Sequence, residues 1–177
     1  MSGALHQLKL DYFAAEDRLV LRISTHDKTE VRLWLTRRFT KALWQGLIKV
    51  VEANPSALHA TDPQSRESVI AFQHEQAVDE EQFGHTFEET ATVFPLGETP
   101  SLIVGLTIGS PEPGDPPRLV FETAEKRLIS LGLDEQILHS LMHLLALAMK
   151  QTDWDIILDF TVTAASEAMP ERRAQLH

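Results

Sequence analysis

The residues in this sequence best suited to bind a ligand are basic side chains gathered around one tryptophan near the N-terminus. The candidate binding residues are Lys9, Arg18, Arg22, Arg32, Trp34, Arg37, Arg38 and Lys41. Cations bind phosphates and aromatic rings stack on unpaired bases, so this combination suits single-stranded nucleic acid. The sequence therefore allows a single-strand binding site in this region.

The same cations have acidic neighbours that could neutralise them. Asp11, Asp17 and Glu30 lie nearby in the sequence, and residues 75–89 hold six acidic residues and no lysine or arginine. The cations can pair with these carboxylates, meet an acidic partner protein, or remain solvated. The net charge of −10 also opposes binding to nucleic acid. We therefore place a protein contact first and single-stranded nucleic acid second.

A second candidate site consists of His139 and His143, four residues apart on a predicted helix. Two histidines at this spacing can share a metal ion. The segment between them reads Ser-Leu-Met, so it lacks the glutamate of the H-E-x-x-H motif. We expect these histidines on the helix face opposite Leu141 and Leu145, as surface or edge residues, and we expect no metal or other cofactor.

Sequence signatures of common enzymes are missing. The chain has no phosphate-binding loop of the G-x-x-x-x-G-K-[ST] type, no G-x-S-x-G elbow and no cysteine. It also lacks a G-x-G-x-x-G turn after a predicted strand. These observations favour a non-enzymatic protein, although they do not exclude an enzyme.

Three predicted strands position the basic residues. Apolar residues alternate in 5–13, 18–24 and 30–35, which predicts an antiparallel meander. The alternation predicts that one set of side chains faces the core, namely Leu8, Leu10, Tyr12, Leu19, Leu21, Ile23, Val31, Leu33 and Leu35. Lys9, Arg18, Arg22, Arg32 and Trp34 then share the outward face. We expect Thr36 to cap a following helix that extends to about Val51.

The second half repeats this pattern. We expect strands at 87–94, 102–108, 118–123 and 126–133, a helix at 135–151 capped by Asp134, and a closing strand at 154–161. Leu33, Leu35, Phe39 and Leu43 recur in kind as Leu131, Leu133, Ile137 and Leu141. The predicted fold is α+β, with two similar antiparallel β-meander-plus-helix halves forming one pseudo-twofold domain. Its parts are 1–54, an acidic connector at 55–85 with one possible helix, 86–162, and a flexible tail at 163–177.

Two resemblances accompany this pattern. In topology, the duplicated meander-plus-helix resembles the Whirly-type single-strand-binding fold. The segment RLWLTRRF, residues 32–39, resembles uncharacterised bacterial proteins. The resemblance to these bacterial proteins covers residues 18–51 and 118–150. It implies a fold family and no activity.

Composition limits the cellular setting. The sequence shows no basic-then-apolar leader pattern and no apolar run of about 20 residues, the length that a membrane helix needs. The absence of cysteine fits a reducing compartment. We expect a cytoplasmic interaction or scaffold protein that self-associates into a homo-oligomer. The charge is asymmetric, because residues 1–60 have nine basic and six acidic residues and residues 61–177 have seven and twenty.

Overall fold

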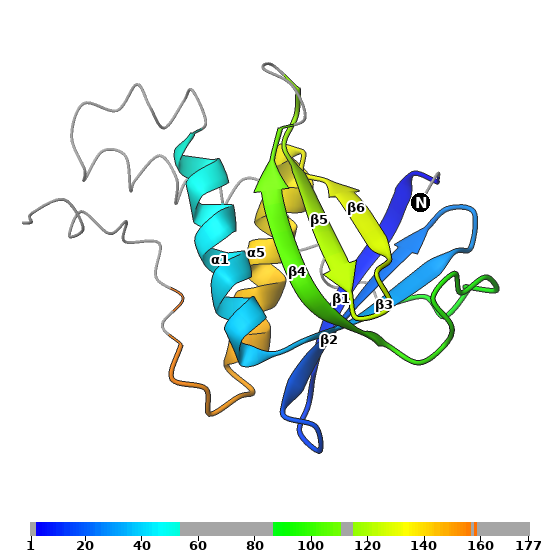
Figure 1. The fold of residues 1–177 in the computed structure, drawn as a ribbon, viewed down its shortest axis with the longest axis horizontal. Helices are drawn as coiled ribbons and strands as arrows, with labels where there is room; N and C mark the ends of the chain where they lie inside the picture. Colours follow the sequence, from blue (N-terminus) through cyan, green and yellow to red (C-terminus); the bar gives the residue numbers. More distant parts are fainter. Residues whose placement is uncertain (1–2, 54–86, 111–114, 157, 159–177) are drawn as a thin grey trace, which may run out of the picture.

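A computed structural model describes residues 3–53, 87–110, 115–156 and 158. Figure 1 shows one curved sheet with two helices against one face. The strands are β1 (Leu5–Phe13), β2 (Arg18–Thr25), β3 (Glu30–Leu35), β4 (Ser101–Gly109), β5 (Arg118–Thr123) and β6 (Leu128–Gly132), and the helices are α1 (Arg37–Glu52) and α5 (Glu135–Met149). The predicted α+β class is confirmed. The predicted connector at 55–85 and tail at 163–177 lie outside the described residues.

The first meander has the predicted strands and inward residues. Leu10, Leu21 and Leu33 align across β1, β2 and β3 and are all buried. Full burial of one such leucine contributes about 1.5–3 kcal/mol relative to exposure. The alternation therefore sets the register, because a one-residue slip would turn these side chains to the opposite face.

The six strands form one mixed sheet in chain order. All neighbours are antiparallel except β3 and β4, which pair in parallel at Leu33–Ser101 and Trp34–Leu102. A register shift interrupts β4 between Ile103 and Gly105. A Cβ at Gly105 would lie 3.0 Å from that of Glu122, so glycine permits this close approach. The two meanders thus share one continuous sheet.

The helices lie side by side and are exchanged between the halves (Figure 1). α1 follows the first meander but contacts β4, the first strand of the second meander. Conversely, α5 follows the second meander and contacts β1. This reciprocity fits a twofold relation between the halves. Internal duplication itself stays a prediction.

The helix caps differ. Asp134 accepts a hydrogen bond from the amide of Ile137 at 2.8 Å, as predicted. Thr36 occupies the N-cap position of α1 with extended backbone, but its side chain makes no capping hydrogen bond. The predicted capping bond of Thr36 is therefore wrong. Arg37 and Arg38 still occupy the first turn of α1, and no acidic residue accompanies them.

Two predicted strands are not formed in the described residues. Residues 87–94 contain only an isolated bridge from Val93 to Thr29. The C-terminal part of the β3 edge pairs with β4, so this segment pairs only with residues 28–30 at the start of that edge. Residues Trp154 to Ile156 also form no strand. Trp154 is buried, and its indole Nε1 donates to Asp17 Oδ1 at 2.6 Å.

Candidate functional site

The outer face of the first meander, turned away from the helices, carries five of the predicted binding residues. Lys9 aligns with Arg22, and Arg22 aligns with Arg32 on the next strand. Like charges directly opposite one another destabilise a sheet. This row of three cations therefore requires nearby carboxylates.

Glu30 is the first of these carboxylates and is fully buried at the start of β3. Arg22 donates to it from Nε at 2.7 Å and from Nη2 at 3.0 Å. Arg32 donates from Nε to the same carboxylate at 2.6 Å. A buried carboxylate is costly unless it is paired and hydrogen-bonded, and two guanidinium groups meet that requirement here.

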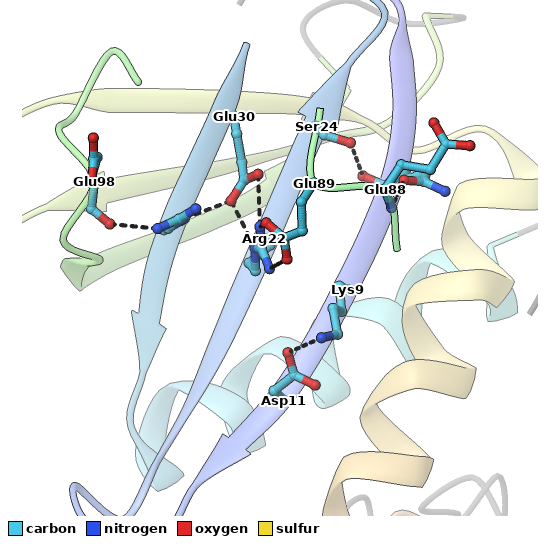
Figure 2. Close-up of polar contacts among 10 residues, drawn as sticks. Lys9, Asp11, Arg22, Ser24, Glu30, Glu88, Glu89 and Glu98 are labelled. Atoms are coloured by element: carbon cyan, nitrogen blue, oxygen red, sulfur yellow. Dashed lines mark hydrogen bonds and ion pairs between the residues drawn. The ribbon is translucent and has the colours of Figure 1, made fainter. Parts of the chain in front are cut away.

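Glu89 is the second carboxylate and comes from a distant part of the sequence. Its Oε1 accepts from Nη1 of Arg22 at 2.6 Å, and its Oε2 accepts from Nη2 at 2.6 Å. Figure 2 shows Glu30 and Glu89 converging on Arg22. Such a two-bond fork fixes the carboxylate in direction as well as position. We call Arg22, Glu30, Arg32 and Glu89 the ionic network.

Residues 87–99, which we call the covering segment, lie over this network. The ring centroid of Phe87 is 4.3 Å from the guanidinium carbon of Arg22. The ring centroid of Phe94 is likewise 4.9 Å from the guanidinium carbon of Arg32. Guanidinium groups are attracted to aromatic faces, more strongly where water is excluded. Each arginine is therefore held by both a carboxylate and a ring.

Backbone hydrogen bonds fasten the covering segment to the turn between β2 and β3. The amides of Thr92 and Val93 both donate to the carbonyl of Lys28, at 2.9 and 3.1 Å. The carbonyl of Val93 accepts from the amide of Glu30 at 2.9 Å. Nη1 of Arg32 donates to the carbonyl of Glu98 at 3.1 Å. The segment thus covers the part of the first meander's outer face that lies next to the β2–β3 turn.

The ionic network shifts the pKa values of its members. Burial opposes ionisation of Glu30, but the hydrogen bonds from Arg22 and Arg32 outweigh it and lower its pKa. The hydrogen bonds from Arg22 also lower the pKa of Glu89. The pKa of Arg22 is raised, chiefly by its hydrogen bonds to Glu89 and Glu30. All three groups are therefore charged at neutral pH.

The remaining sheet residues of the predicted set occupy the same face. Lys9 pairs with Asp11 at 3.0 Å, and Arg18 pairs with Glu16 at 3.6 Å. Trp34 is half-buried, and its ring centroid lies 5.6 Å from that of Phe13. The four sheet cations of the predicted set are thus all paired with carboxylates of the same chain. This agrees with the intramolecular interpretation that the sequence left open.

Arg37, Arg38 and Lys41 lie elsewhere, on the exposed side of α1. Lys49 extends this group toward the C-terminal end of the helix. None of the four forms an ion pair within the described part of the chain. The structure therefore divides the predicted basic patch into a paired sheet face and an unpaired helix face.

The two histidines on α5 do not form the predicted surface pair. His139 is only 1% exposed, whereas His143 is half-buried. The prediction that both are surface or edge residues is wrong for His139, because α5 is buried on the side opposite Leu141 as well. Burial lowers the pKa of both histidines. Among the described residues no group of three or more His, Asp or Glu side chains could hold a metal ion.

Surface grooves border both helices. One of about 640 Å³ lies between edge strand β1 and α5, and it includes Ile137, Ser140 and Leu144. Another of about 630 Å³ lies between the C-terminal half of α1 and the start of α5, and it includes Gly46, Ile108 and Leu138. Neither groove contains the ionic network, although Lys9 and Phe87 border the first.

Comparison of the chain with family models, curated proteins and solved structures gave no match. Among the described residues, no helix is both long and apolar enough to cross a membrane. The function is therefore argued from the surfaces themselves.

Sequence reasoning found the face and named most of its carboxylates as possible partners, but it missed the two aromatic rings. Glu30 and the acidic stretch ending at Glu89 were recognised as possible partners, without any means of choosing between them. The contribution of Phe87 and Phe94 was missed. Two aromatic residues seven apart beside Glu88 and Glu89 are a weak signal for a segment that packs on an arginine-rich sheet.

Proposed function

We propose that this protein is a non-enzymatic interaction protein that associates with a second copy of itself. The proposed contact surface is the outer face of the second meander. This proposal rests on the contrast between the two meanders. The outer face of the first is occupied by the covering segment, whereas that of the second meets no comparable segment among the described residues.

The uncovered face carries exposed apolar side chains, and this observation carries the proposal. Leu128 is 69% exposed on β6, and Val104 is 42% exposed beside the irregularity in β4. Scattered apolar residues are common on protein surfaces, but two exposed apolar side chains on one open sheet face favour a protein contact.

The position of Leu128 adds to this argument. It lies on β6, which pairs only with β5 among the described strands. An edge strand presents unpaired amides and carbonyls that can pair with another chain. A stable contact between two copies requires about 800 Å² on each, which an edge strand and its adjoining sheet face can supply together.

Binding of single-stranded nucleic acid remains the alternative proposal. It requires free cations next to an exposed ring. The cations that share a sheet face with Trp34 are already paired with Asp11, Glu16, Glu30 and Glu89. This argues against binding of nucleic acid on that face.

The experiment compares the oligomeric state of two aspartate variants by size-exclusion chromatography with light scattering. Leu128→Asp places a charge on the proposed surface, and Leu147→Asp is the matched control, because Leu147 is 40% exposed on α5. We expect the wild-type protein and Leu147→Asp to have the mass of an oligomer and Leu128→Asp that of one chain. Equal masses for the two variants, with circular dichroism confirming that both are folded, would refute the proposed surface.

A further inference from the structure

The exposed side of α1 carries a line of cations. Arg38, Lys41 and Lys49 are all exposed, with Gln45 between them. At about 100° per residue these four positions fall on one side of the helix, and they span about 16 Å along its axis. Arg37 lies at the border of the same side. We call Arg37, Arg38, Lys41 and Lys49 the helix cations.

The helix cations differ from the sheet cations in their partners. Lys9, Arg18, Arg22 and Arg32 each pair with a carboxylate of this chain. The helix cations have no such partner among the described residues. Lys28, Arg118, Arg127 and Lys150 also form no ion pair among the described residues, but α1 gathers four such cations on one helix.

The N-terminal cations are placed against local preference. The N-terminal end of a helix disfavours positive charge by about 0.3–1 kcal/mol per exposed residue. Arg37 and Arg38 occupy this first turn, and the side chain of Thr36 forms no capping bond. Such departures from local preference concentrate at functional positions. An anionic partner lying along α1 would offset the unfavourable charge of these two arginines. It would also bring negative charge to a helix N-terminus that lacks a side-chain cap.

We propose that the exposed face of α1 binds an acidic segment of another protein. Charge complementarity selects an anionic occupant, because three cations lie on one line with spacings of three and eight residues. Carboxylates at matching positions on a helix could meet them over three turns. This contact lies on α1 and is independent of the proposed association through β6.

A protein segment fits this face better than a nucleic acid does. Bases require accessible aromatic rings, but Trp44 of α1 is buried and Phe39 is half-buried. The ring of Phe39 is also close to Arg38, whose guanidinium carbon lies 5.1 Å from its centroid. A net charge of −10 further disfavours a long polyanion.

Fluorescence anisotropy tests the proposal with a labelled helical peptide that carries glutamates at matching spacing. The comparison peptide has glutamine in place of each glutamate, and a labelled single-stranded oligothymidine tests nucleic acid. The variant Arg38→Glu/Lys41→Glu/Lys49→Glu reverses the line of charge. The control Arg118→Glu/Arg127→Glu/Lys150→Glu makes the same change in net charge at exposed cations outside α1.

We expect the glutamate peptide to bind the wild-type protein and the control variant, with affinity that falls as salt is added. The α1 variant should bind at least tenfold more weakly, and the glutamine peptide should not bind. No binding at low salt, or an equal loss in both variants, would overturn the proposal. Tighter binding of the oligothymidine through the same residues would assign the surface to nucleic acid instead.

Two further outcomes would assign the α1 face to this chain itself. A lower oligomer mass for the α1 variant, without peptide binding to the wild-type protein, would indicate a second copy as the occupant. A large gain in peptide affinity in Asp79→Asn/Glu80→Gln/Glu81→Gln would indicate the chain's own acidic stretch. Either result would overturn an external acidic partner, and neither depends on Leu128.

Discussion

At the scale of single residues, the informative feature is the pairing state of each cation. The sequence predicted which cations share the outer sheet face, because strand alternation fixes the direction of Lys9, Arg22 and Arg32. It could not predict that Glu89 would pair with Arg22, since 67 residues separate them. Nothing in local periodicity encodes such a distant contact. The burial of His139 was missed for the same reason, because it depends on how α5 packs against other elements of the fold.

The buried carboxylate of Glu30 provides the first test at this scale. Replacing it in Glu30→Gln leaves Arg22 and Arg32 close together without their shared anion. Breaking a buried ion pair on one side costs about 3–5 kcal/mol, so we expect a loss of this size in the free energy of unfolding. Urea denaturation at neutral pH measures it.

The matched control for this change is Glu16→Gln, which removes the partner of Arg18. That pair is solvent-exposed, with side chains 35% and 49% accessible, and exposed pairs contribute about 0–1 kcal/mol. Similar losses in Glu16→Gln and Glu30→Gln would show that the ionic network does not stabilise the fold.

At the scale of elements, the covering segment is the feature that depends on ionisation. Glu89 has a folded-state pKa below its ordinary value of 4.5. A carboxyl group with a lowered pKa stabilises the folded state above its unfolded pKa, and this contribution is lost as pH falls through the folded value. The attachment of the segment should therefore weaken in acid.

The variant Glu89→Gln isolates this effect. We expect it to be less stable than the wild-type protein at neutral pH, because Arg22 loses its charged partner. The difference between the two proteins should shrink as the pH falls below 4.5, where Glu89 of the unfolded chain becomes protonated. Urea unfolding of both proteins over a pH series measures it. A difference that does not change with pH would contradict the assigned role of the carboxylate.

The two helix caps give a second test at this scale, because equivalent positions behave differently. Asp134 hydrogen-bonds the amide of Ile137, whereas the hydroxyl of Thr36 makes no such bond. We expect Asp134→Ala to cost about 1 kcal/mol of stability, as a lost N-cap does. Thr36→Ala should cost clearly less. Thermal unfolding of both variants checks this order, and a larger loss in Thr36→Ala would reverse it.

At the scale of the whole molecule, the sequence predicted the class, the six strands and both helices, together with two strands at 87–94 and 154–161 that the described residues do not form. Repetition of Leu33, Leu35 and Leu43 as Leu131, Leu133 and Leu141 supported this prediction, because each element shows its own period. The parallel pairing of β3 with β4 and the exchange of helices were not predicted. Both depend on how two halves with similar apolar faces cover each other, which periodicity within one half does not contain.

The outer faces of the two meanders also differ in how accessible they are to a partner. The covering segment and the ionic network occupy the outer face of the first meander, so its cations serve the fold. Among the described residues, the second meander leaves Val104 of β4 and Leu128 of the edge strand β6 exposed. This division, with one face used internally and one open, is the central claim of the account.

Sedimentation equilibrium of the wild-type protein over a wide range of concentration tests this claim most directly. The account predicts a mass above that of a single chain, falling toward it on dilution or in Leu128→Asp. Association through the open face would bury Leu128 and pair the edge of β6. A single species with the mass of one chain at every concentration would contradict the account.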